Sequence, residues 1–163
     1  MYTVAIITAS DKGYTGERED LSGKVIEEIV TSAGLQVAEK VILPDDREML
    51  AEKMLSCCQA NIDLILTTGG TGFSKRDVTP EATADVVERR ADNLTFAMIA
   101  NSLQYTPKAM LSRGIAGIRE NTLIVNLPGS PKAVRENLEY AMDAILHGVK
   151  ILKGDDAECA RKE

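Results

Sequence analysis

The sequence predicts an α/β fold of three layers (α/β/α), in which a mostly parallel central sheet with one antiparallel strand lies between helices. Apolar runs of strand length alternate with segments whose apolar residues recur at helical intervals. Several of these runs are nearly continuous, as expected of strands buried on both faces. The 163 residues, 44% of them hydrophobic, have the length of one domain with one core. We therefore expect a single domain over residues 1–154 and a polar tail over residues 155–163.

The first half of the chain predicts three strands separated by two helices. Residues 3–10, TVAIITAS, form an apolar run that ends in small polar residues, which is typical of a central parallel strand. Residues 21–34 space their apolar side chains at helical intervals and end in glycine, so a helix is expected there. Residues 35–43 predict a second strand, residues 44–61 a second helix and residues 62–68 a third strand. This alternation indicates right-handed βαβ units.

The second half predicts three more helices and a pair of short strands. Helices are expected over residues 79–91, where Thr-Pro opens the segment, and over residues 93–105. Residues 114–127 predict two short strands around a polar turn, one of which adds an antiparallel strand to the sheet. The last helix is expected over residues 130–148, with a serine as N-cap and a C-terminal glycine.

Composition and charge exclude several classes of protein. The net charge of −6 argues against a general nucleic-acid binder, because affinity for the phosphate backbone needs clustered Lys and Arg. No segment is long and apolar enough to span a membrane, and we recognise no targeting signal, so we expect a cytoplasmic protein. Cys57, Cys58 and Cys159 form no C-x-x-C motif and have no histidine nearby, so we expect no zinc site. An anionic ligand would have to be held locally, by helix N-termini, glycine-rich backbone or a divalent cation.

Polar residues follow each of the first three predicted strands at the point where the strand ends. In parallel sheets, ligands bind at the carboxyl ends of the strands. The sequence therefore predicts a binding site at this edge of the sheet. The residues at these three strand ends are Ser10 and Asp11, then Asp45, then Thr68, Gly69 and Gly70.

The stretch TTGGTGFSKRDVTP, residues 67–80, holds more glycine than an ordinary turn needs. It does not match the P-loop, which requires Gly-Lys-Ser/Thr, and it lacks the third glycine of the dinucleotide-binding fingerprint. A tight turn from strand to helix is one interpretation. A backbone that approaches a ligand closely is the other, and it explains the surplus of small residues better. The four residues concerned are Gly69, Gly70, Thr71 and Gly72.

Two aspartates near this stretch have a structural interpretation and a functional one. Asp77 could pair with Arg76 or complement a helix dipole. Asp45 and Glu48 have the spacing of a capping box. Two carboxylates at the ends of neighbouring strands, on either side of a glycine loop, would also hold a hard divalent cation against phosphate oxygens.

A second glycine turn, NLPGSPKAV at residues 126–134, also joins a strand end to a helix. Lys132 lies in the first helical turn, where a cation is unfavourable to the helix dipole. Its presence indicates either a bound anion or a solvated side chain. Ser112 and Arg113 are candidates for a further basic contact.

Two long motifs, TTGGTGFSKRDVTPEAT and SRGIAGIRENTLIVNLPGSPKAV, closely resemble those of the MogA/MoaB family of molybdenum-cofactor biosynthesis proteins, which includes the G domains of plant Cnx proteins and gephyrin. The resemblance covers nearly the whole chain. It implies a molybdopterin adenylyltransferase, in which the terminal phosphate of molybdopterin attacks the α-phosphorus of ATP and releases pyrophosphate. It also implies a homotrimer, or a hexamer, and contact with the molybdenum-insertion protein.

The resemblance implies catalytic roles for Asp45 and Asp77, which would bind Mg²⁺ and orient the phosphates. ATP and molybdopterin would be the substrates. The residues implied to contact the nucleotide or the pterin are Ser10, Asp11, Thr68, Gly69, Gly70, Thr71, Gly72, Ser112, Asn126, Pro128, Gly129, Ser130 and Lys132.

The chain departs from the family pattern at two positions. Many members carry Glu, and Arg three positions later, in the helix after the DVTP segment, where this chain has Phe96 and Ile99. We interpret this region as more apolar than usual, used for packing or subunit contact. A non-catalytic pterin-binding or scaffolding protein of the same fold is the alternative function, because a fold can keep its site and lose its chemistry. The retained aspartate pair favours the enzyme. A nucleotide-binding domain with no pterin role is a third, weaker hypothesis.

Overall fold

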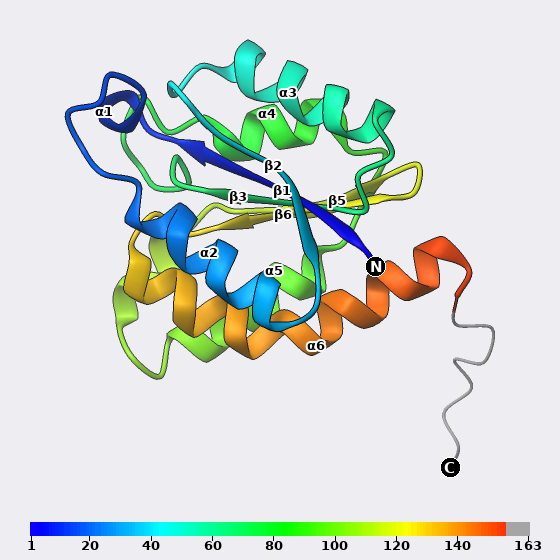
Figure 1. The fold of residues 1–163 in the computed structure, drawn as a ribbon. Coiled ribbons are helices and arrows are strands. Elements are labelled where there is room, and N and C mark those ends of the chain that lie inside the picture. The colour runs from blue at the N-terminus through cyan, green and yellow to red at the C-terminus, as the bar shows by residue number, and fades with distance from the viewer. Residues whose placement is uncertain (156–163) are drawn as a thin grey trace.

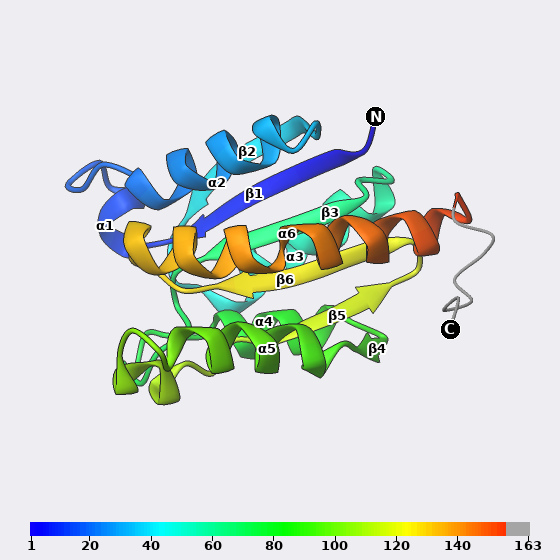
Figure 2. The same ribbon diagram turned by 90° about the horizontal axis from the view of Figure 1, so that it is seen from below.

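The structure, a computed structural model, describes residues 1–155 and has three layers (Figure 1). Helices α3 and α4 cover one face of the central sheet, and α2, α5 and α6 cover the other (Figure 2). The strands are β1 (Thr3–Ala9), β2 (Gln36–Leu43), β3 (Leu64–Thr68), β4 (Arg89–Arg90), β5 (Ala116–Arg119) and β6 (Thr122–Leu127). The helices are α1 (Asp11–Tyr14), α2 (Leu21–Ser32), α3 (Arg47–Gln59), α4 (Thr79–Val86), α5 (Asp92–Ser102), the 3-10 helix η1 (Pro107–Leu111) and α6 (Pro131–Lys153).

The sheet has the strand order β2-β1-β3-β6-β5-β4, in which β2, β1, β3 and β6 are parallel. Strand β5 runs antiparallel to β6 and to β4. The predicted fold class is therefore confirmed, including its one antiparallel strand. The register pairs Thr8 of β1 with Thr68 of β3, and Thr68 with Leu127 of β6. The carboxyl ends of these three strands thus lie level with one another.

The core consists of two apolar clusters, one on each face of the sheet. Along β1, Val4 and Ile6 contribute to the cluster beneath α2, α5 and α6, while Ala5 and Ile7 contribute to the cluster beneath α3 and α4. All four side chains are fully buried. This alternation explains the nearly continuous apolar runs, and full burial of a large aliphatic side chain stabilises a fold by about 1.5–3 kcal/mol.

Two of the predicted helix boundaries are wrong. Helix α4 ends at Val86 rather than at residue 91, because Arg89 and Arg90 pair with β5 as the short strand β4. Helix α6 continues past residue 148 to Lys153 and ends at Gly154, whose φ of +74° is favourable only for glycine. The apolar pattern of α6 continues with buried Val149, so Gly148 does not stop the helix.

Two of the three cysteines lie in α3 and pack in the core. Cys57 and Cys58 are buried. Burial, with the nearby Glu39 carboxylate, raises the pKa of the Cys57 thiol to about 11, so it stays protonated and unreactive at neutral pH. Cys159 lies outside the described residues. Within residues 1–155 we find no helix with the length and hydrophobicity that a membrane crossing requires.

The C-terminal end of α6 is fixed to the sheet at the amino-terminal ends of the parallel strands, which lie opposite their carboxyl ends. Lys153 Nζ lies 2.9 Å from Oδ1 of Asp63, which is 6% exposed, and Thr3 N–H donates to Oδ2 of Asp63 at 2.9 Å. Two residues beyond Lys153, Asp155 accepts a hydrogen bond of 2.6 Å from the Tyr2 hydroxyl.

Replacing Asp63 by asparagine is expected to lower the free energy of unfolding at pH 7 by about 2 kcal/mol, because it removes a charge-assisted contact to Lys153. Burial alone would raise the pKa of Asp63, but the Thr3 N–H and Lys153 hold it below its ordinary value of 3.8. A lowered pKa stabilises the folded state above pH 3.8, and this contribution is lost as the pH falls below that value. Urea denaturation from pH 7 to pH 3 should therefore show a difference between variant and wild type that shrinks in acid. Equal stabilities at pH 7 would contradict the assignment.

Candidate active site

The glycine stretch begins where β3 ends and passes directly over the end of β1. Gly69 and Gly70 both have left-handed backbone conformations, with φ of +87° and +69°. A Cβ on Gly69 would lie 2.3 Å from the carbonyl oxygen of Ala9. Gly69 is therefore explained by close packing of the chain against β1, which is the structural interpretation of the glycines.

Close packing also explains Gly70, here against Thr79 and Asp45. A Cβ there would lie 2.3 Å from Oγ1 of Thr79 and 3.1 Å from Oδ1 of Asp45. The carbonyl of Gly70 accepts a hydrogen bond from the N–H of Thr79, the first residue of α4. The missing side chain thus lets the second strand end, the third strand end and the start of α4 pack closely together at Gly70.

Asp45 is not the helix cap that its spacing to Glu48 suggested. Asp46 caps α3 instead, by accepting a hydrogen bond of 2.9 Å from the N–H of Met49. Oδ2 of Asp45 accepts from the N–H of Asp11 at 3.1 Å, whereas Oδ1 is buried with no hydrogen-bond partner among the described residues. Burial raises the pKa of Asp45, and the negative charges of Asp11 and Asp77 raise it further. This carboxylate is held in an environment that disfavours its charge.

Asp77 lies in the loop that precedes α4. Its Oδ2 accepts a hydrogen bond of 3.0 Å from the N–H of Ser74, and this atom would lie 2.9 Å from a Cβ on Gly72. Arg76 donates two hydrogen bonds, of 2.9 and 3.0 Å, to the carboxylate of Asp11. This pair holds the pKa of Asp11 below its ordinary value.

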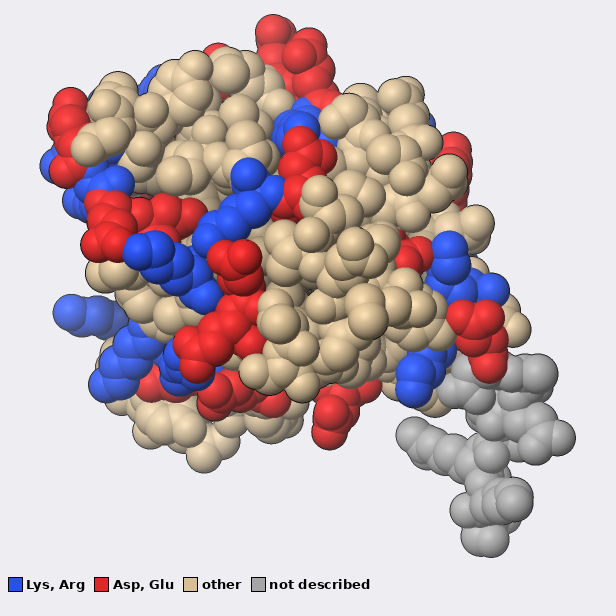
Figure 3. Space-filling view, in the orientation of Figure 1, with Lys and Arg blue, Asp and Glu red and all other residues tan. Residues whose placement is uncertain are grey.

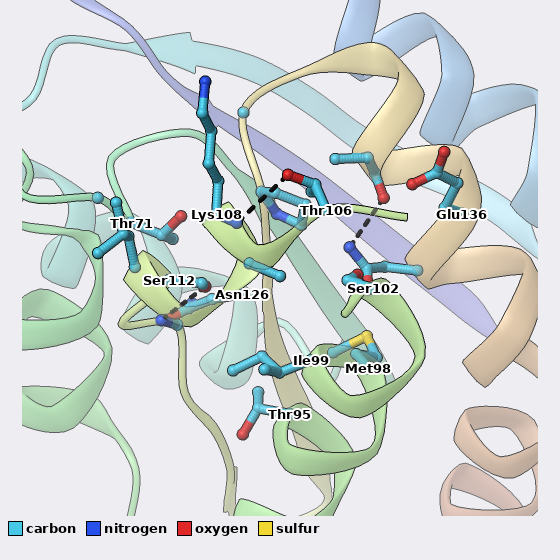
Figure 4. Close-up of a pocket in the computed structure, with 18 of the residues that line it drawn as sticks. Thr71, Thr95, Met98, Ile99, Ser102, Thr106, Lys108, Ser112, Asn126 and Glu136 are labelled. Atoms are coloured by element: carbon cyan, nitrogen blue, oxygen red, sulfur yellow. Dashed lines mark hydrogen bonds between the residues drawn. The ribbon is translucent and has the colours of Figure 1, made fainter. Parts of the chain in front are cut away.

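Two cavities meet at Gly70, Asp77 and Gly129, which line both. The first, of about 440 Å³, lies between the glycine stretch, α5, η1 and the start of α6 (Figure 4). The second, of about 550 Å³, lies between the end of β1, the start of α2 and the start of α6. The predicted residues that line only the first are Thr71, Gly72, Ser112, Asn126 and Pro128. Those that line only the second are Ser10, Asp45, Thr68, Gly69 and Ser130.

Several predicted contact residues also build the walls of the cavities. The side chain of Asn126 donates to the hydroxyls of Thr67 and Thr83, both at 2.9 Å, and accepts from the N–H of Ile115. The hydroxyl of Thr68 donates to the carbonyl of Pro128 at 2.6 Å, which ties the two glycine turns together. Ser130 caps α6 by accepting from the N–H of Ala133, as predicted.

The structure does not bring every predicted residue to the cavities. Lys132 is exposed and lies beside Tyr105 and Arg135 in a separate surface groove. Asp11 lines neither cavity and acts through Asp45 and Arg76.

Other lining residues were not predicted. Thr95, Met98, Ser102, Lys108, Glu136 and Asn137 line the first cavity, and Arg18, Asp20 and Ser22 line the second. Thr95 and Ser102 are buried polar side chains of α5, but the sequence of this helix does not set them apart from its other polar residues. Ile99, noted for its departure from the family pattern, also lines the first cavity.

The geometry fits a divalent cation that is held jointly by protein and substrate. Asp45 supplies a buried oxygen that has no hydrogen-bond partner within residues 1–155, and Asp77 lines the same cavity. Within residues 1–155 no group of three or more His, Cys, Asp or Glu side chains could hold a metal by itself. Mg²⁺ commonly takes one or two carboxylates and completes its coordination with water and substrate phosphates.

Comparisons of the sequence with a family model and with known proteins agree on one family. Residues 5–147 match the family model described as "probable molybdopterin binding domain". A molybdopterin adenylyltransferase of Helicobacter pylori strain J99 is 41% identical over 93% of this chain and 88% of its own length. Gephyrin of Dictyostelium discoideum is 40% identical over 93% of this chain, which corresponds to 22% of the relative.

The fold comparison agrees. The crystal structure of the molybdopterin biosynthesis enzyme MoaB from Thermus thermophilus superposes with a TM-score of 0.89 at 42% identity, over 94% of this chain and 98% of that one. Sequence motifs, fold and relatives thus lead to one conclusion: the chain belongs to the MogA/MoaB family of molybdenum-cofactor biosynthesis proteins.

Proposed function

We propose that this chain is a molybdopterin adenylyltransferase, which transfers the adenylyl group of ATP to molybdopterin with the help of Mg²⁺. The relatives that carry this enzyme's name cover most of the chain at 35–41% identity. The observation that carries the proposal is the junction of two cavities at the carboxylate of Asp77, with the carboxylate of Asp45 in the wall of the second cavity. A transfer between two substrates needs both of them to meet at one point, and positioning supplies much of the catalysis.

The two cavities suit different substrates. The first combines apolar side chains such as Met98 and Ile99 with hydroxyls such as Ser102 and Ser112, as a planar pterin with polar edges requires (Figure 4). The second receives the N-terminal ends of α2 and α6, whose backbone N–H groups favour phosphate. We assign molybdopterin to the first cavity and ATP to the second.

Asp45 and Asp77 would hold the Mg²⁺ ion from the wall of the second cavity, which both residues line. When bound, Mg²⁺ neutralises phosphate charge and lowers the cost of transferring a phosphoryl centre. It would also remove the electrostatic cost of ionised Asp45, whose pKa is raised by burial and by two neighbouring carboxylates. A protein that only bound pterin would gain nothing from such a carboxylate.

The reaction forms one bond and breaks one. A terminal phosphate oxygen of molybdopterin bonds to the α-phosphorus of ATP, while the bond from that phosphorus to the bridging oxygen of the β-phosphate breaks and pyrophosphate leaves. The chain's own residues orient the two phosphates for this displacement. Gly70 and Gly129 present backbone at the junction of the two cavities, and Ser130 at the start of α6 lines the ATP side.

An assay with molybdopterin, ATP and Mg²⁺ tests the proposal. We expect adenylyl-molybdopterin and pyrophosphate in equal amounts, and no product when Mg²⁺ or either substrate is omitted. Tight pterin binding without product would instead support the non-catalytic pterin-binding or scaffolding protein. Binding of ATP alone, without any effect of molybdopterin, would support the general nucleotide-binding domain.

The proposal includes a homotrimer or hexamer in the cytoplasm that contacts the molybdenum-insertion protein. Phe96 and Met110 are 70% and 67% exposed, and contact between copies would cover such apolar side chains. We propose no nucleic-acid partner. On the face shown in Figure 3, Lys and Arg lie interspersed with Asp and Glu rather than in a continuous basic surface.

A further inference from the structure

We propose that Arg113 is a positioning residue for this reaction, which holds the carboxylate of Asp77 in place through the loop that carries it. The inference rests on the proposed function in one respect, the assignment of Asp77 to the reacting phosphates. It changes the expectation that Arg113 adds a basic contact to substrate, because its guanidinium is occupied by the protein itself.

The guanidinium of Arg113 contacts both ends of the loop from Gly72 to Asp77. Its Nε donates to the carbonyl of Gly72 at 2.8 Å, and its Nη2 donates to the carbonyl of Asp77 at 2.9 Å. Its backbone N–H donates to the carbonyl of Thr71 at 2.8 Å. One residue thereby fixes the end of the glycine stretch and the start of α4 relative to each other.

The loop between these two carbonyls has little else to hold it. Phe73, Ser74 and Arg76 are exposed. Ser74 and Asp77 close the loop on itself, since the N–H of Asp77 donates to the carbonyl of Ser74 and the N–H of Ser74 donates to Oδ2 of Asp77. The ion pair of Arg76 with Asp11 has two hydrogen bonds, but both side chains are exposed, so solvent and salt screen it. Arg113 is therefore the more buried of these two attachments of the closed loop to the body of the protein.

The third contact of the guanidinium shows why its charge is not directed at substrate. Nη1 of Arg113 lies 2.5 Å from Oε1 of Glu81, in the first turn of α4. The carboxylate neutralises the guanidinium locally. A planar group with donors on several edges can reach the carbonyls of Gly72 and Asp77 and the Glu81 carboxylate at once, whereas the single ammonium of lysine cannot span them.

The experiment compares Arg113→Lys and Arg113→Gln with a matched control, Arg119→Lys. Arg119 also donates from its guanidinium to a backbone carbonyl of α4, that of Val86 at 2.9 Å, but it lines neither cavity. We expect both Arg113 variants to lose about a hundredfold in kcat, because a displacement of about 1 Å has effects of this size. In both Arg113 variants, the Mg²⁺ concentration that gives the half-maximal rate should rise, while the KM for molybdopterin should stay within about twofold of wild type. Arg119→Lys should match wild type in all three quantities.

A readout independent of activity separates positioning from the function itself. In hydrogen exchange, the amides of Ser74 and Asp77 should lose protection in Arg113→Lys and keep it in Arg119→Lys. Millimolar methylguanidinium should restore part of the rate of Arg113→Ala. Wild-type kcat, Mg²⁺ dependence and loop protection in Arg113→Lys would overturn the inference, and so would a rate loss that only follows the unfolded fraction seen by circular dichroism. A wild type that makes no adenylyl-molybdopterin would overturn the proposed function instead, and the exchange data would still decide whether Arg113 holds the loop.

Discussion

Replacing Asp45 or Asp77 by asparagine is expected to lower the rate of molybdopterin adenylylation by about a thousandfold. Each change removes one of the two carboxylates that would hold Mg²⁺ against the phosphates, and a loss of about 4 kcal/mol of transition-state stabilisation corresponds to that factor. The measurement is the single-turnover rate at saturating ATP, with pterin binding followed separately by fluorescence. We expect pterin binding to change by less than about threefold, because the uncharged amide keeps the shape of the cavity.

The two variants are expected to differ in stability, which makes them each other's control. The pKa of Asp45 is raised, first by burial and then by neighbouring carboxylates. Protonated Asp45 therefore stabilises the folded protein at a pH below the ordinary pKa of this carboxyl. This stabilisation is lost as the pH rises through the raised pKa. Asp45→Asn should be more stable than wild type at pH 7, by about 1 kcal/mol, and the gain should vanish below pH 4. Asp77→Asn should show no such gain, because the weakened hydrogen bond from the Ser74 N–H offsets the relief of repulsion with Asp45. Full activity in either variant would contradict the metal assignment.

Replacing Gly69 by alanine is expected to have the largest effect on folding, about 4 kcal/mol of destabilisation. The new Cβ would meet the carbonyl oxygen of Ala9 at 2.3 Å, and the φ of +87° is unfavourable for alanine. Backbone cannot move aside as a flexible side chain can, so the end of β3 must separate from β1. Chemical denaturation measures the loss, and an assay at low temperature shows whether the remaining folded protein has an altered site.

Gly34→Ala is the matched control for this substitution. Gly34 has nearly the same φ, +85°, but no atom of residues 1–155 outside its own neighbourhood lies within 4 Å of the position of its Cβ. It should cost only about 1 kcal/mol, which reflects the left-handed conformation alone. The difference of about 3 kcal/mol between the two variants would then measure the contact with Ala9. If both variants lost the same amount, packing of Gly69 against β1 would not be the reason for glycine at this position.

The sequence predicted the sheet well because a buried strand and an amphipathic helix each have a period that is visible in the order of residues. It failed at Arg89 and Arg90, where a charged pair forms an edge strand only because β5 offers it hydrogen-bond partners. It also ended α6 too early, since a glycine inside a helix and a glycine that ends one look alike until the packing of Val149 is known.

Part of the candidate site could also be predicted, because the order of strands and helices shows which residues end the strands. Residues at strand ends, such as Asp45 and Gly70, could be assigned from the topology of a parallel sheet. Ser102 and Asn137 could not, because they come from α5 and α6, whose placement over the first cavity depends on tertiary packing. The guanidinium of Arg113 was assigned to substrate because sequence gives the charge of a side chain but not its partners.

The position of α6 has a consequence for how this domain can be joined to others. With 23 residues, the helix is about 35 Å long, and it runs from Ser130 at the candidate site to Lys153 beside Asp63 at the opposite edge of the sheet. Tyr2 contacts Asp155 there, so both ends of the described chain leave the domain together, a helix length away from the site (Figure 1). Additional sequence can extend from either end without covering the cavities. The same fold can therefore serve as a module in a longer polypeptide, as it does in the Dictyostelium gephyrin, where the matching region is less than a quarter of the chain.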